Sequence, residues 1–221
     1  MNDSILRRRS GSAPKNFLTR ILALGLMICS LPAGAAAPVA CKILILGDSL
    51  SAGYGLTRGA GWVDLLRQRL GQQSQDCLIV NASISGETTI GGRNRLPALL
   101  AAHSPSLLIL QLGANDGLRG LPVKNMEDNL IAMVQAAQRT RARTLLIGIR
   151  MPPNYGVAYT TAFANSFQTV AARTRIPLVP FFFEGIAGQA SAFQADGIHP
   201  NEQAQQRLLD NVWPEIARQL K

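Results

Sequence analysis

Five short runs rich in Ile, Leu and Val alternate with longer segments of helical pattern, and this alternation limits the fold more than any other feature of the sequence. The apolar runs lie at residues 42–46, 78–80, 107–112, 145–149 and 178–182. The helical segments lie at 62–70, 93–102, 123–138, 158–173 and 204–220. Strands that alternate with helices indicate a parallel sheet with both faces covered. The sequence therefore predicts an α/β fold with a five-stranded parallel sheet between two layers of helices.

The first 36 residues differ from the rest of the chain. Five Lys and Arg residues precede an apolar run at 21–31, and small residues follow at 33–37. This order is typical of a secretory signal peptide, whereas a membrane anchor would need ~20 apolar residues. We expect a signal peptide at 1–36, a single domain at 37–221, no stable membrane span after cleavage, and a periplasmic or secreted protein.

The positive charge of the sequence belongs largely to this first segment. The formal net charge of +9 falls to +5 when residues 1–36, with five basic residues and one Asp, are set aside. The remaining basic residues form no stripe with interleaved aromatic residues, which a nucleic-acid-binding surface would have. We expect no nucleic-acid partner.

Cys41 and Cys77 each stand at the start of an apolar run. If the two strands are neighbours in a parallel sheet, both sulfur atoms lie at the same sheet edge and can pair in an oxidising compartment. Two inert, buried thiols are the alternative, and the sequence does not decide between them.

Polar, Gly-rich segments follow four of the apolar runs, at 47–51, 81–88, 113–117 and 150–156. In an open α/β sheet these segments all lie at the carboxyl edge, where such folds bind their ligands.

Of the two histidines, His103 precedes a strand and belongs at the opposite edge, so we expect it to be structural. His199 follows Asp196 by three residues, and Pro200 suits the first turn of the last helix. An Asp at this spacing can orient the imidazole and leave its second nitrogen free to act as a base.

Ser49 follows the first strand, at the entry to a short helical turn, where its own backbone N–H can bind a developing oxyanion. The G-x-S-x-G motif of α/β-hydrolases is absent from the chain. A catalytic serine in this chain must therefore belong to a different set of sequence motifs.

Four sequence blocks form such a set and occur in this order: GDSLS at 47–51, NASISGET at 81–88, LGANDGLRG at 112–120 and DGIHP at 196–200. With these blocks the chain resembles the SGNH (GDSL-type) hydrolases, and NDGLRG and PNYG are similar to the bacterial periplasmic group of multifunctional thioesterases, lysophospholipases and arylesterases. The resemblance implies a doubly wound, flavodoxin-like αβα fold.

The resemblance also implies a role for each block. Ser49 is the expected nucleophile, His199 the base and Asp196 its orienting partner. The backbone N–H groups of Ser49 and Gly86 and the side-chain amide of Asn115 are the expected oxyanion hole.

The sequence departs from this group at Ala114, where Gly is usual. If the position required a positive φ, Ala would change how Asn115 is presented. We expect a small effect.

Apolar side chains are predicted beside the site, where Leu118, Met151, Pro153 and Tyr155 suit an acyl chain better than a sugar. Packing against the sheet is the alternative for each of them. We expect a serine esterase that hydrolyses acyl esters and thioesters, lysophospholipids included, through an acyl-enzyme on Ser49.

Two other functions fit the same fold, namely a carbohydrate (acetyl) esterase and a catalytically silent binding module. The low aromatic content disfavours the first, because sugar-binding sites use aromatic platforms, and the complete set of blocks disfavours the second. No metal and no cofactor is expected, since the sequence has no cluster of metal ligands at usable spacing. A small acyl ester or lipid is the expected partner, and a monomer the expected state.

Overall fold

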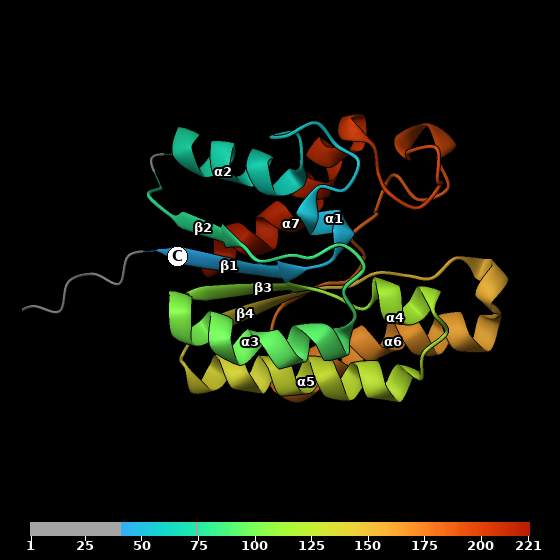
Figure 1. Cartoon of the computed structure of the whole chain (residues 1–221), viewed down its shortest axis with the longest axis horizontal. Coiled ribbons are helices and arrows are strands. Elements are labelled where there is room, and N and C mark those ends of the chain that lie inside the picture. Colours follow the sequence, from blue (N-terminus) through green and yellow to red (C-terminus); the bar gives the residue numbers. More distant parts are fainter. Residues whose placement is uncertain (1–40, 74) are drawn as a thin grey trace, which may run out of the picture. The chain divides into compact units, whose positions relative to one another are not determined.

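The computed structural model describes residues 41–73 and 75–221, so the predicted signal peptide at 1–36 lies outside the described residues. Five parallel strands form one sheet in the order β2-β1-β3-β4-β5 (Figure 1). The strands are β1 (Lys42–Gly47), β2 (Leu78–Asn81), β3 (Leu107–Gln111), β4 (Arg143–Ile147) and β5 (Leu178–Val179). The α-helices are α1 (Ser49–Ala52), α2 (Trp62–Gln72), α3 (Thr89–His103), α4 (Ala114–Leu118), α5 (Val123–Arg139), α6 (Val157–Thr174) and α7 (Glu202–Gln219).

The strand order explains why both faces of the sheet are covered. The chain enters at β1, winds to β2 on one side, and then returns past β1 to β3, β4 and β5. Crossovers between parallel strands are right-handed, so a change of direction moves the connecting helix to the other face. Helices α2 and α7 pack together on one face, and α5 lies between α3 and α6 on the other (Figure 1). The predicted three-layer, doubly wound fold is confirmed.

The core lies on both faces of the central strands. Every residue of β3 is buried: four apolar residues and Gln111 at its end. On α5 the residues Met126, Leu130, Val134 and Ala137 recur at helical spacing and are buried, whereas the opposite side of the helix is polar. Burial of one such aliphatic side chain stabilises the fold by roughly 1.5–3 kcal/mol.

Some predicted boundaries differ from the observed ones for physical reasons. Strand β5 ends at Val179, not at residue 182, because Pro180 has no N–H for the ladder. Helix α3 begins at Thr89, four residues before the predicted start, because the carboxylate of Asp116 accepts from the Thr89 N–H at 2.8 Å. The prediction that Pro200 lies in the first turn of the last helix is wrong: Asn201 caps α7 and Pro200 precedes it.

A disulfide joins Cys41 and Cys77 at the amino edge of the sheet, where the register places Lys42 opposite Leu78. The alternative of two free thiols is thereby excluded. His103 is the last residue of α3, at the same edge, as predicted. In the described part of the chain, no helix is both long enough and apolar enough to cross a membrane.

Loss of this disulfide is expected to lower stability without changing activity. The bridge closes a loop with a sequence separation of 36 residues, for which the chain-entropy relation gives about 4 kcal/mol. Urea unfolding of the Cys41→Ala/Cys77→Ala double variant measures this loss, and esterase assays of the folded variant provide the control. An unchanged midpoint, or activity lost while the variant is still folded, would contradict the expectation.

Candidate active site

The loop after β1 presents Ser49 as the first residue of α1, a helix that Gly53 ends in the left-handed conformation. Asp48 caps this helix, and its carboxylate accepts from the Leu50 N–H at 3.0 Å. Only a glycine fits at position 47, because a Cβ there would lie 2.8 Å from Gln111 Oε1 and from the Ser51 side chain. The sequence Gly-Asp-Ser thus follows from a tight exit from the strand.

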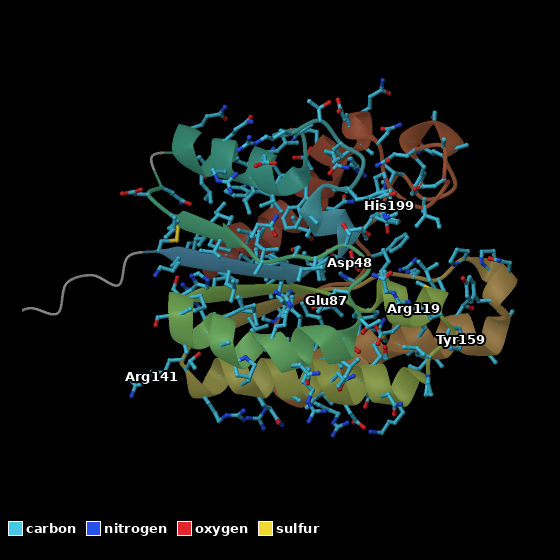
Figure 2. All side chains as sticks on the ribbon, in the orientation of Figure 1. Asp48, Glu87, Arg119, Arg141, Tyr159 and His199 are labelled. Atoms are coloured by element: carbon cyan, nitrogen blue, oxygen red, sulfur yellow. A yellow bond between two sulfur atoms is a disulfide. The ribbon has the colours of Figure 1, made fainter. Side chains whose placement is uncertain are left out.

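Asp48 is buried and belongs to a small polar network (Figure 2). Its Oδ1 also accepts from Gln111 Nε2 at 3.1 Å, and Ser51 Oγ donates to Gln111 Oε1 at 2.6 Å. No described residue bonds its Oδ2. Burial raises the pKa of Asp48 to about 6, although the bonds from Leu50 and Gln111 partly offset this. A carboxyl group without full hydrogen bonding in an apolar setting favours its neutral form.

Asp196, His199 and Ser49 form a chain of hydrogen bonds across the site. His199 Nδ1 lies 2.7 Å from Asp196 Oδ2, and His199 Nε2 lies 2.8 Å from Ser49 Oγ. Hydrogen bonds from the His199 N–H and side chain and from the Ile198 N–H lower the pKa of Asp196 to about 2. An ionised carboxylate can only accept, so Nδ1 donates to it, and Nε2 of the neutral ring is left to accept from the Ser49 hydroxyl.

Two residues that the sequence analysis did not single out hold the imidazole in place. The ring of Tyr54 lies 4.6 Å from that of His199, centroid to centroid. Gln194 donates its backbone N–H to the His199 carbonyl and its side-chain amide to the Tyr54 carbonyl, at 2.8 and 2.9 Å. These contacts join the loop of the nucleophile to the loop of the base. Neither residue belongs to a recognisable motif, so only the folded chain reveals them.

The three predicted oxyanion donors lie at the same sheet edge. No described residue accepts from the backbone N–H of Ser49 or of Gly86. Gly86 has φ +79°, and this conformation, not lack of space, is why glycine is needed there. Asn115 donates one amide hydrogen to the Glu87 carbonyl at 3.0 Å, which leaves its second hydrogen available.

Ala114 fits the site without strain. It is the first residue of α4 and has no positive φ, because the left-handed residue is Gly113, at φ +123°. A Cβ at Gly113 would lie 2.9 Å from Met126 Sδ. The positive φ is thus required at position 113 and not at position 114. This is why we expect Ala in place of Gly at position 114 to have a small effect.

A cleft of about 1020 Å³ opens from Ser49 and His199, with Asn115 in its lining. Leu118, Met151 and Pro153 line it, as predicted. Tyr155 does not belong to this lining, and a substrate contact there stays a prediction. Its hydroxyl donates to the Leu118 carbonyl at 3.1 Å and supports the wall from behind.

Three aromatic side chains that no sequence motif indicates also line the cleft. They are Phe181, Phe183 and Phe193. Phe181 lies in the apolar run at 178–182 that predicts a strand, whereas Phe183 and Phe193 lie in no predicted element. The early end of β5 turns Phe181 toward the cleft. Among the described residues, no cluster of three or more His, Cys, Asp or Glu side chains can hold a metal ion.

Residues 45–207 match the GDSL-like lipase/acylhydrolase family. The chain belongs to this family. It is 51% identical over 174 residues to esterase TesA of Pseudomonas aeruginosa, across 79% of this chain and 87% of that protein. It is 42% identical over 185 residues to thioesterase 1/protease 1/lysophospholipase L1 of Escherichia coli K12, across 84% and 86% of the two chains.

A solved structure agrees with the sequence comparisons. The crystal structure of TesA aligns with a TM-score of 0.79 at 49% identity, and the alignment covers 80% of this chain and 99% of that one. The predicted family, its fold and an acyl-hydrolase activity are thereby confirmed.

The buried carboxyl of Asp48 predicts a pH-dependent contribution to stability. Because its pKa rises from 3.8 to about 6 on folding, the native state binds more protons than the unfolded state between these values. The stabilisation by the protonated group is therefore complete below pH 4 and lost as the pH rises through 6, by about 3 kcal/mol. Urea unfolding of wild type and Asp48→Asn at pH 4 and pH 7 should show the difference between their unfolding free energies change by most of that amount. Parallel stability curves would contradict the assignment.

Proposed function

We propose that Ser49, His199 and Asp196 hydrolyse acyl esters and thioesters in two steps. The chain of hydrogen bonds from Asp196 through His199 to Ser49 Oγ is the observation that carries the proposal. His199 Nε2 takes the hydroxyl proton while Oγ attacks the acyl carbon, and it then returns the proton to the departing alcohol or thiol. Water, activated by the same nitrogen, attacks the acyl-enzyme and releases the fatty acid and free Ser49.

The negative charge of each tetrahedral intermediate needs donors that are already in place. Ser49 N–H, Gly86 N–H and the second amide hydrogen of Asn115 are free to supply them. Donors of this kind act without reorganisation and stabilise the transition state more than the substrate.

The cleft favours an acyl chain of medium or greater length. Its lining is mostly apolar and includes Leu118, Met151 and three phenylalanines. Two relatives are named an esterase and a thioesterase 1/protease 1/lysophospholipase L1, which is consistent with such substrates. A carbohydrate acetylesterase needs no cleft of this size for its acyl group.

The protein is proposed to act after export, in the periplasm or outside the cell. The predicted signal peptide and the Cys41–Cys77 disulfide support this location, because structural disulfides persist in oxidising compartments. Lysophospholipids are more accessible there than acyl-CoA.

Ser49→Ala is expected to lower kcat/KM at least ~10³-fold on p-nitrophenyl esters, since it removes the nucleophile. Wild type should hydrolyse octanoate and decanoate faster than acetate. Ser106→Ala, at the opposite sheet edge, is the matched control and should retain full activity. Activity confined to acetate would favour the carbohydrate esterase, and activity that survives Ser49→Ala would contradict the mechanism.

Asn115→Ala is expected to lower kcat about 10²–10³-fold with little change in KM, because the lost donor acts on the intermediate and not on the bound ester. Asn125→Ala, on the exposed side of α5, serves as the matched control. A loss expressed mainly in KM would instead mean that Asn115 binds the substrate.

A further inference from the structure

Two segments that are distant in sequence supply the oxyanion donors, and hydrogen bonds tie them together. Gly86 lies in the loop before α3, and Asn115 lies in α4. The Asn115 amide donates to the Glu87 carbonyl at 3.0 Å, and Arg119 donates to the Gly86 carbonyl at 3.0 Å. Asn115 lies in the first turn of α4 and Arg119 is the residue that ends this helix, so both bonds come from one short segment. Figure 2 shows Glu87 and Arg119 beside the carboxyl ends of the central strands.

Asp116 adds the strongest link between the two segments. Its Oδ2 accepts from the Thr89 N–H at 2.8 Å, and its Oδ1 accepts from Thr89 Oγ1 at 2.5 Å. The side chain of Thr88, which precedes α3, makes no capping bond, so Asp116 caps α3 in its place. The start of α3, and with it the end of the Gly86 loop, is therefore fixed by a residue next to Asn115.

Because Asp116 and Thr89 are buried, the hydrogen bonds between them favour one arrangement of α4 and α3. Asp116 is 4% exposed and Thr89 is fully buried. Asn129 donates to Thr89 Oγ1 at 3.1 Å, and Arg93 donates to Asn129 Oδ1 at 3.1 Å. Loss of one partner would leave a buried donor or acceptor unsatisfied, so the two segments are held in one arrangement.

We propose that Asp116 and Arg119 are positioning residues of the oxyanion hole. They hold the Gly86 loop against α4, so that the Gly86 N–H and the free amide hydrogen of Asn115 meet at one oxygen. The inference rests on the proposed role of Gly86 and Asn115. Neither residue touches the substrate in this account; both act through the donors that they hold.

The proposal predicts a specific kinetic pattern. Displacement of a catalytic group by ~1 Å can cost roughly 10²-fold in rate. Both oxygens of Asp116 accept hydrogen bonds from Thr89, but the side chain of Asn has one acceptor oxygen and one donor NH2 group. In Asp116→Asn one of these bonds is therefore lost, and kcat should fall about 10²-fold. Arg119→Met removes one exposed hydrogen bond, the one to the Gly86 carbonyl, so kcat should fall about 10-fold. KM should stay within about twofold in both, since the walls of the cleft are untouched.

The experiment compares these variants with matched controls. Asp128→Asn and Arg173→Met remove exposed ion pairs elsewhere and should leave kcat unchanged. Arg119→Lys keeps a donor and should restore most of the activity that Arg119→Met loses. Circular dichroism and urea unfolding confirm that each variant is folded. Because Arg119 is exposed, its variants test the proposal even if Asp116→Asn does not fold.

Inhibition separates positioning of the oxyanion hole from a purely structural role. A decyl trifluoromethyl ketone forms an oxyanion on the serine, whereas a dialkyl ether of equal length only occupies the cleft. The variants should bind the ketone more weakly in proportion to their loss of kcat and bind the ether as wild type does. In the double variant Asp116→Asn/Asn115→Ala the losses should be less than multiplicative, because both act on one group.

Each other outcome overturns the proposal. Folded variants with wild-type kcat, multiplicative losses in the double variant, or equal weakening of both inhibitors would exclude a positioning role. A change confined to KM would make Arg119 a substrate-binding residue instead. If Ser49→Ala and Asn115→Ala abolish activity while Asp116→Asn and Arg119→Met do not, only this inference fails. If Ser49→Ala is active, the proposed function itself fails.

Discussion

The hydrogen bond between Ser49 Oγ and His199 Nε2, at 2.8 Å, is the contact on which the arrangement of this site depends. It joins residues 150 positions apart, one at the end of the first strand and one just before the last helix. The segment before α7 returns to the carboxyl end of β1, and this brings the two residues together. The Asp196 carboxylate then fixes the tautomer, so that the free nitrogen faces the hydroxyl.

Around this contact the protein uses buried polar groups as internal supports. Asp48 and Gln111 hold the exit of β1 from below, and Asp116 ties α4 to the start of α3. These carboxyls differ in their bonding. Asp116 has hydrogen-bond partners for both oxygens, whereas Asp48 leaves one oxygen without a described partner and has a raised pKa. Both carboxyls make hydrogen bonds that join segments distant in sequence at the carboxyl edge of the sheet.

The sequence was sufficient for the layers, the strands and the motif residues, because apolar periodicity and short motifs are local properties. The sequence was insufficient where contacts between residues far apart in the chain determine where a helix begins or which side chains line the cleft. The start of α3 depends on Asp116, which follows 27 residues later, and Pro200 precedes the N-cap of α7 instead of lying in its first turn. The apolar run at 178–182 predicts a strand that includes Phe181, whereas in the structure Phe181 lines the cleft together with Phe183 and Phe193. The pairing of Cys41 with Cys77 needed the observed neighbourhood of β1 and β2.

The most direct test of the central claim is to trap the acyl-enzyme. Wild-type protein is mixed with excess p-nitrophenyl decanoate, quenched in acid within the first turnovers, and digested for peptide mass spectrometry. The account predicts a decanoyl group on the peptide that contains Ser49, attached to that residue, and no such group in protein whose Ser49 is replaced by Ala. Turnover with the acyl group on a different residue would contradict it.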